Sequence, residues 1–191
     1  MAAVQDSSEL DRMFDELEHL NLPADYRVEI IGGEIVMNPQ RKVHSTIIRG
    51  LNRALEEQLG SDAIVLWDVR IDFPGLLNGF APDVALVREG AEEDDNGNHD
   101  YRDIELVAEV VSKGSRRDDY EAKLKVYAAA GVPTYIIANP MSGFVHVHHD
   151  PREGAYRDEA GYTFGSTFTL PHPKVVIDTS TWPRDRQANR S

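Results

Sequence analysis

Two short apolar runs, each carrying one carboxylate, limit how this chain can fold. Residues 81–87 read Ala-Pro-Asp-Val-Ala-Leu-Val, and residues 105–111 read Glu-Leu-Val-Ala-Glu-Val-Val. Both have the length and the β-branched content of buried strands. A carboxylate that points into a half-buried sheet is costly unless it is paired or binds a cation. The sequence therefore predicts a cation beside Asp83 and Glu109.

Strand periodicity places both acids. In a strand over residues 105–111, Glu109 shares a face with Val107 and Val111. Asp83 follows Pro82, which can begin a strand but not occupy its centre, so Asp83 is expected at a strand start. Taken alone, each acid has a plainer interpretation: a Glu on an exposed edge strand, and an Asp in a turn.

An amine follows the second run. Asp118 or Asp119 can open a helix that runs to about Ala130, with Gly131 as its C-cap. Lys123 borders the buried stripe of this helix, with Asp119 four residues earlier on the same face. The side chain of Lys123 either extends to solvent or points across the sheet toward the carboxylates.

Two acids and one amine are typical of a metal-dependent phosphodiesterase. Mg²⁺ prefers carboxylate and carbonyl oxygens together with waters, which Asp83, Glu109 and the carbonyl of Val110 would supply. Such an ion polarises a phosphate and lowers the pKa of a bound water. Lys123 would hold that water or stabilise the developing charge.

Composition bounds the class of protein. The 191 residues predict one domain, and the net charge of −13 argues against a nucleic-acid partner. Residues 88–103 alone contribute −5 and predict an exposed loop. Five basic residues gather just after the second run and can still hold phosphate: Lys113, Arg116, Arg117, Lys123 and Lys125.

The remaining pattern predicts an α/β (α+β) fold with a mixed sheet flanked by helices. The expected helices span residues 7–20, with Ser7 or Ser8 as N-cap, and residues 43–59. The expected strands span 26–31 and 34–38 as a hairpin, 65–73, 134–138 and 144–149, with short edge strands at 155–157, 161–164 and 167–170. We divide the chain into an N-terminal helix (1–22), a main domain (23–170) and a fraying C-terminal tail (171–191).

The cellular setting follows from what the sequence lacks. It has no cysteine, its apolar runs are far shorter than a membrane span, and its first residues do not resemble a secretory signal. We expect a cytoplasmic protein without a membrane partner.

A histidine-rich segment offers a second candidate metal site. His146 and His148 share one face of the predicted strand over residues 144–149 and could bind Zn²⁺ or Ni²⁺. Only Asp150 is near enough in sequence to be a third ligand, so an exposed strand face is the favoured interpretation. Trp67 and Trp182 are expected to pack in the core and against the tail.

The order and spacing of these pieces resemble the PD-(D/E)xK nuclease superfamily, and specifically the Uma2 family of restriction-endonuclease-like proteins. The matching pieces span roughly residues 23–150. They are residues 28–39 (Val-Glu-Ile-Ile-Gly-Gly-Glu-Ile-Val-Met-Asn-Pro), His44, residues 82–84, residues 107–112, Asp119 with Lys123, Leu124 and Tyr127, and residues 131–135 (Gly-Val-Pro-Thr-Tyr).

The resemblance implies a restriction-endonuclease-like fold and Mg²⁺- or Mn²⁺-dependent hydrolysis of DNA. It implies a metal at Asp83 and Glu109 and a catalytic lysine at Lys123. In the wider superfamily the lysine lies two residues after the acid, where this chain has Val111, and Uma2-like chains resemble one another in taking the amine from the following helix. Glu29 and His44 match further family positions that line the site; a strand-end Glu and a helix N-terminal His are the plainer interpretations.

A second function class stays open. The chain is alternatively a catalytically silent binding module that keeps the scaffold, with a homodimer as one form. The acidic surface favours this class, whereas the presence of all three of Asp83, Glu109 and Lys123 favours the enzyme.

Overall fold

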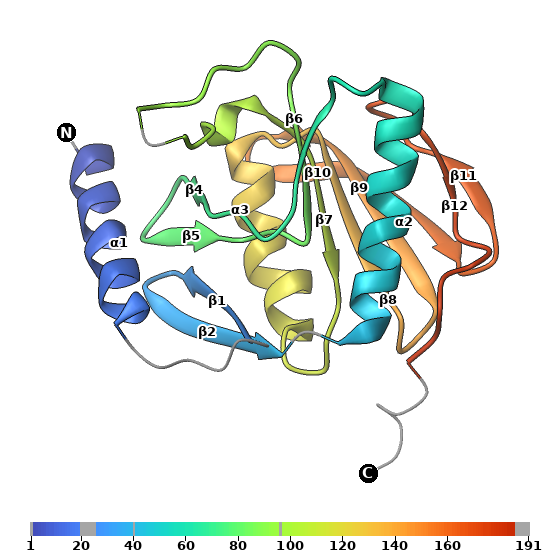
Figure 1. Ribbon diagram of the computed structural model, residues 1–191, viewed down its shortest axis with the longest axis horizontal. Helices are drawn as coiled ribbons and strands as arrows, with labels where there is room; N and C mark the ends of the chain where they lie inside the picture. The colour runs from blue at the N-terminus through green and yellow to red at the C-terminus, as the bar shows by residue number, and fades with distance from the viewer. Residues whose placement is uncertain (1, 20–25, 40, 96, 186–191) are drawn as a thin grey trace.

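A six-stranded mixed sheet with a helix on each face forms the centre of the molecule (Figure 1). The computed structural model describes residues 2–19, 26–39, 41–95 and 97–185. The helices are α1 (Ala2–Glu18), α2 (Lys42–Leu59) and α3 (Lys123–Ala130), with a 3₁₀ turn at Tyr101–Asp103 and a π-helical turn at Asp118–Ala122. The strands are β1 (Tyr26–Ile31), β2 (Glu34–Pro39), β3 (Ile64–Leu66), β4 (Ile71–Phe73), β5 (Asn78–Phe80), β6 (Val84–Val87), β7 (Ile104–Val110), β8 (Thr134–Asn139), β9 (Phe144–Arg152), β10 (Ala155–Thr163), β11 (Thr167–Thr169) and β12 (Val176–Asp178).

The central sheet has the order β10-β9-β8-β7-β6-β3. Strands β7 and β8 are parallel, and the other neighbours in this sheet are antiparallel. A parallel pair requires a crossover connection, and here the π-helical turn and α3 provide it. The predicted α+β fold with a mixed sheet flanked by helices is confirmed.

Strand alternation divides β7 between two cores. Leu106, Ala108 and Val110 pack with α2, whereas Val107 packs with Tyr127 of α3 and with Val111, which follows β7. Since side chains of a strand alternate in direction, Glu109 faces α3, as the sequence predicts.

A second sheet has four strands in the order β2-β1-β5-β4. Its strand β1 brings Arg27 and Glu29 toward β7. The predicted hairpin is confirmed, because Ile31 pairs with Glu34 around Gly32 and Gly33. Both glycines have positive φ angles (60° and 82°), which residues with a Cβ rarely adopt. Leu10 and Leu17 of α1 pack on Ile30 and anchor this sheet from its outer side.

The predicted strand over residues 65–73 is wrong. It is split into β3 and β4, which belong to different sheets. The break lies at Asp68, whose φ of 61° is incompatible with a strand and whose carboxylate pairs with Arg27. As a result Trp67, predicted to lie in the core, is 56% exposed.

Both ends of the chain also differ from expectation. Helix α1 begins at Ala2, so Ser7 and Ser8 lie inside it and neither is its N-cap; the predicted end at residue 20 lies outside the described residues. The predicted fraying tail is wrong for residues 171–185, because β12 pairs with β11 there. The tail buries three apolar side chains, Val175, Ile177 and Trp182, and Leu170 just before it is buried as well.

Two further features of the fold bear on the predictions. The edge strands expected at 155–157 and 161–164 are one continuous strand, β10, paired with β9. Among the described helices, none is long and apolar enough to cross a bilayer.

Candidate active site

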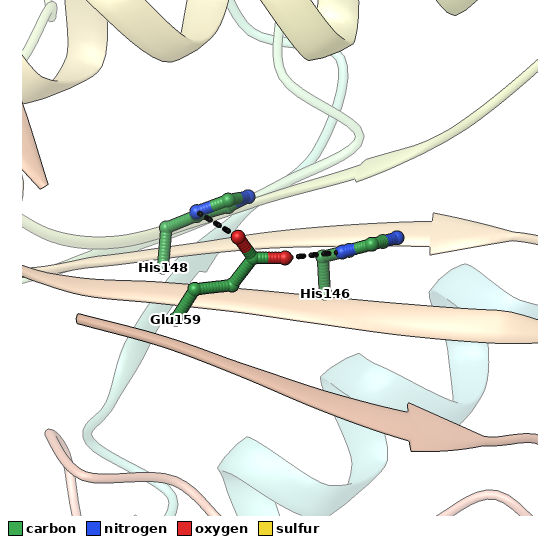
Figure 2. A group of neighbouring side chains, drawn as sticks. All are labelled: His146, His148 and Glu159. Atoms are coloured by element: carbon green, nitrogen blue, oxygen red, sulfur yellow. Dashed lines mark hydrogen bonds and ion pairs between the residues drawn. The ribbon is translucent and has the colours of Figure 1, made fainter.

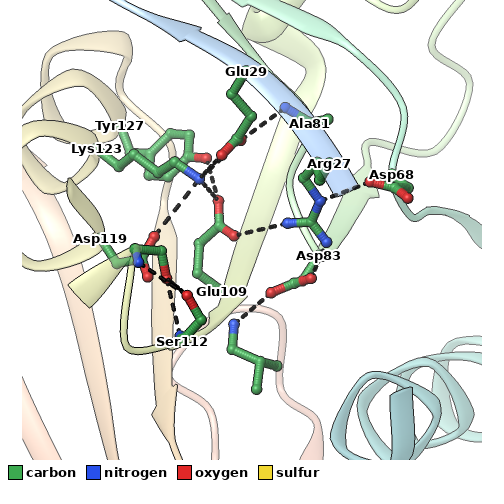
Figure 3. Close-up of polar contacts among 12 residues, drawn as sticks. Arg27, Glu29, Asp68, Ala81, Asp83, Glu109, Ser112, Asp119, Lys123 and Tyr127 are labelled. Carbon is green, nitrogen blue, oxygen red and sulfur yellow. Dashed lines mark hydrogen bonds and ion pairs between the residues drawn. The ribbon is translucent and has the colours of Figure 1, made fainter. Parts of the chain in front are cut away.

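Glu109 lies at the centre of a buried polar cluster between β7, the four-stranded sheet and α3 (Figure 3). Its Oε1 accepts hydrogen bonds from Lys123 Nζ at 2.9 Å and from the Tyr127 hydroxyl at 2.9 Å. Its Oε2 faces the Arg27 guanidinium at 3.6 Å. Three elements therefore converge on one carboxylate.

Lys123 points inward and is 1% exposed. Its ammonium donates to both carboxylate oxygens of Glu29, at 2.8 Å and 2.7 Å, as well as to Glu109. Asp119, one helical turn earlier, faces the same ammonium at 3.6 Å. Val111, at the position where a lysine on the same strand would lie, is buried in the hydrophobic core. The amine that contacts Glu109 therefore comes from the helix.

Asp83 lies immediately before β6, where Pro82 allows the strand to begin. Its Oδ2 accepts the backbone N–H of Val110 at 2.6 Å, which ties the start of β6 to the end of β7. Its Oδ1 is hydrogen-bonded to Arg27, so one guanidinium lies between Asp83 and Glu109.

Glu29 and His44 also reach the cluster. Glu29 is fully buried, and its Oε1 accepts the backbone N–H of Ala81 at 3.0 Å. His44, in the first turn of α2, is buried beside it. The cavity between these groups has a volume of about 20 Å³, room for about one water-sized particle. Its lining includes every residue predicted for the site: Glu29, His44, Asp83, Glu109, Val110 and Lys123.

The crossover segment is fixed at its start. Ser112 and Ser115 bond reciprocally, because Ser112 N donates to Ser115 Oγ at 3.0 Å and Ser115 N donates to Ser112 Oγ at 2.9 Å. The Tyr135 hydroxyl donates to the carbonyl of Asp119 at 2.9 Å. These contacts hold the π-helical turn against the sheet, and such turns recur at functional sites.

Comparison with known proteins places the chain in a family. A model of the family described as "Uma2: Putative restriction endonuclease" matches residues 14–178. The chain belongs to the Uma2 family. The fold is also similar to a crystal structure described as "a putative nuclease belonging to DUF820", from Anabaena variabilis ATCC 29413. That likeness has a TM-score of 0.62 at 16% identity and covers 88% of this chain and 97% of the other.

At this identity the structural likeness establishes the fold, and the family match establishes the relationship to restriction-endonuclease-like nucleases. A comparison with curated proteins finds no match. The roles of individual residues in this Uma2 chain therefore rest on their own geometry.

The cluster holds more negative than positive charge. Four buried carboxylates (Glu29, Asp83, Glu109 and Asp119) surround Lys123 and the largely buried Arg27. Burial raises the pKa of Glu109 to about 8, an effect that Lys123 opposes and that Glu29 and Asp119 reinforce. Burial likewise raises the pKa of Asp119, again opposed by Lys123.

The basic groups respond in the opposite sense. Burial lowers the pKa of Lys123, but Glu109, Glu29 and Asp119 outweigh it and raise the pKa above its ordinary value. Burial lowers the pKa of His44. Burial and the adjacent Glu109 raise the pKa of Tyr127. Lys123 is therefore an ammonium at neutral pH, and Tyr127 is a neutral hydroxyl that donates to Glu109.

The residues present fit a divalent cation. Oxygen ligands dominate the cluster, and when all four carboxylates are ionised they exceed the two buried cations by two, the charge that Mg²⁺ or Mn²⁺ carries. Moreover, the buried Asp119 carboxylate lies 3.6 Å from the Lys123 ammonium, and Ser115 is its hydrogen-bonding neighbour. Asp119 therefore adds negative charge that the buried cations compensate only in part.

Sequence reasoning missed Arg27. A signal was available, because Arg27 lies two residues before Glu29 and must share its strand face. What the sequence does not reveal is that this face meets β6 and β7 from another sheet.

Proposed function

We propose that this protein is a Mg²⁺- or Mn²⁺-dependent endonuclease that hydrolyses phosphodiester bonds in DNA. The observation that carries this proposal is the contact between Lys123 Nζ and Glu109 Oε1, 2.9 Å long and buried, beside Asp83. A buried amine held against a carboxylate on a core strand is the arrangement that the nuclease family implies. In this protein the amine comes from helix α3.

Asp83, Glu109 and the carbonyl of Val110 are the groups that would hold the metal. Once bound there, the ion supplies Lewis-acid polarisation of a phosphate and a lowered pKa for a bound water. Lys123, as an ammonium, donates to a water or to a developing negative charge and does not act as the base. Glu29 positions Lys123 through its two hydrogen bonds.

Arg27 has a further role in the proposal. Its guanidinium balances Asp83 and Glu109 in the metal-free protein. Arginine binds carboxylates and phosphates in the same forked geometry. Arg27 is therefore suited to contact a phosphate when the two carboxylates hold a cation.

The acidic chain nevertheless has a basic rim at this site. Lys113, Arg116 and Arg117 line a pocket of about 480 Å³ on the crossover segment whose neighbours Ser112, Ser115 and Asp119 line the catalytic cavity. All three basic side chains are exposed. By contrast, four of the acidic residues between positions 88 and 103 line a different pocket, together with Asp11 and Arg70: Glu92, Glu93, Asp94 and Asp100. The basic rim gives a DNA backbone a local approach to the site.

The double variant Arg116→Ala/Arg117→Ala is expected to weaken DNA binding about tenfold at low salt. It should also make binding less dependent on salt, because each phosphate contact adds nearly one unit to the slope of log binding constant against log salt concentration. Fluorescence anisotropy with a labelled duplex across salt concentrations measures both effects. The matched control is Arg49→Ala/Arg53→Ala on the exposed face of α2. Equal weakening by the two double variants would remove the rim from the proposal.

The enzymatic proposal is tested by incubating the protein with plasmid and linear DNA in Mg²⁺, Mn²⁺ or a chelator. We expect cleavage that requires the metal and that is lost in Asp83→Asn. Asp62→Asn, an exposed acid beyond α2, is the control and should retain cleavage. Cleavage that persists in Asp83→Asn contradicts the site assignment.

The second candidate is a binding module without catalysis, which the net charge of −13 favours. It predicts no cleavage with either metal, and no heat of Mg²⁺ or Mn²⁺ binding in calorimetry. The homodimer and the cytoplasmic location stay predictions, which sedimentation and cell fractionation would check.

A further inference from the structure

We propose that His146, His148 and Glu159 form a second metal site, which takes a late transition-metal ion such as Zn²⁺. The cluster lies on the β9–β10 hairpin (Figure 2). It shares no residue with the lining of the cavity beside Glu109. Sequence reasoning found the two histidines and offered only Asp150 as a third ligand. The fold supplies Glu159 instead, from the neighbouring strand, because Glu159 pairs with His148 across β9 and β10.

The three side chains converge on one point. One ligand atom from each residue lies within 4.8 Å of the other two. His146 Nδ1 is 2.6 Å from Glu159 Oε1, and His148 Nδ1 is 4.0 Å from Glu159 Oε2. Ligands of a tetrahedral Zn²⁺ with bonds of about 2.0–2.1 Å lie about 3.3 Å apart. Small side-chain rotations close the difference, and the half-exposed Glu159 is free to make them.

Neighbouring aromatic rings orient the histidines. The two imidazoles are parallel within 7°, with centroids 6.2 Å apart. Tyr120 and Phe144 contact His146 edge-on, while Tyr135 and Tyr156 lie against His148. Because both rings are held with Nδ1 toward the same carboxylate, little conformational entropy is lost when an ion binds.

The donor chemistry selects the class of metal. Imidazole nitrogens suit Zn²⁺, Ni²⁺ and Cu²⁺, whereas the all-oxygen cluster at Glu109 suits Mg²⁺ and Mn²⁺.

A groove borders the three side chains. His148 and Glu159 line a pocket of about 340 Å³ between α3 and β10, together with Leu124, Lys125 and Tyr156. An ion held by three protein ligands would leave a fourth position for water, as zinc sites with three protein ligands do. An ion held there would link β9 to β10. It would also lie close to Tyr120, whose ring contacts His146 and which follows Asp119 in the crossover segment.

Calorimetric titration with Zn²⁺ tests the proposal, in the presence of excess Mg²⁺ to occupy the carboxylate cluster. We expect one Zn²⁺ per chain, with affinity at least about tenfold lower in His146→Gln and in Glu159→Gln. Glu159→Gln changes a half-exposed side chain, so its folding is not at risk. His149→Gln is the matched control, since His149 lies next in sequence but pairs with Asp158.

Two further readouts separate this site from the catalytic one. Co²⁺ in place of Zn²⁺ should give visible absorption bands that disappear in His148→Ala and remain in Asp83→Asn. Zn²⁺ affinity that is unchanged in both His146→Gln and Glu159→Gln overturns the proposal. So does Co²⁺ absorption that is lost in Asp83→Asn and kept in His148→Ala.

Discussion

Glu109→Gln is expected to lose metal-dependent DNA cleavage and, at the same time, to stabilise the metal-free protein at alkaline pH. The loss of activity follows because the proposed function assigns the Glu109 carboxylate to the metal. A metal contributes several kcal/mol of charge stabilisation, and each factor of ten corresponds to about 1.4 kcal/mol. We therefore expect cleavage to fall by at least about a thousandfold.

The gain in stability follows from the pKa of the same group. Burial raises the pKa of Glu109 from 4.5 to about 8 in the folded protein. Between these values the folded state holds a proton that the unfolded state has lost, so stability falls as pH rises through this window. Gln has no proton to lose and can still accept from Lys123 or Tyr127.

Urea unfolding in chelator at pH 5, 6.5 and 8 measures this effect. The wild type should lose stability across the series, and Glu109→Gln should lose less. Glu105→Gln, on the same strand but half-buried beside His172, is the control. A wild type whose stability rises from pH 5 to pH 8 in parallel with Glu109→Gln would contradict the charge assignment of the cluster.

Lys123→Met is expected to abolish cleavage while it leaves metal binding intact. The variant removes the ammonium that contacts Glu29 and Glu109 but keeps the apolar stem of the side chain. Metal affinity should stay the same or rise, because the carboxylates lose a competing cation. Calorimetry with Mn²⁺ and the cleavage assay together separate a catalytic amine from a structural one.

The same variant should be markedly less stable. Removing one partner of a buried ion pair costs about 3–5 kcal/mol, because a charge is left uncompensated. The deficit should be largest near pH 8 and smaller near pH 5, where the carboxylates take up protons. Lys125→Met, exposed on the same helix, is the control. Equal unfolding free energies for Lys123→Met and the wild type at pH 8 would show that Lys123 does not neutralise the cluster.

The parts of the site that the sequence predicts are those set by local periodicity. Alternation over residues 105–111 places Glu109 among valines, and the i, i+4 spacing joins Asp119 to Lys123. Both follow from the geometry of a single strand or helix. The hairpin at Gly32 and Gly33 is predicted for the same reason, since its turn requires positive φ angles.

The parts that could not be predicted depend on contacts between distant segments. Arg27 finds Asp83 only because a second sheet packs against β6 and β7. The split at Asp68 is hidden because residues 65–73 alternate without a break, and the ion pair with Arg27 that accompanies the turn joins positions 41 residues apart. Glu159 joins His146 only through the pairing of β9 with β10, and Trp182 is buried only because β12 returns to β11.

The π-helical turn at Asp118–Ala122 has a consequence for how such a site can change over generations. Glu109 is held by strands on both sides of β7, so it cannot shift without disrupting the sheet. Lys123 begins α3, and its direction depends on the register of the turn before it. Because a π turn is an α-helix with one extra residue, a single insertion or deletion there can re-aim the amine while the acid stays in place. A one-residue change in this turn would thus alter which groups the amine of Lys123 faces, without any change in the sheet that holds Glu109.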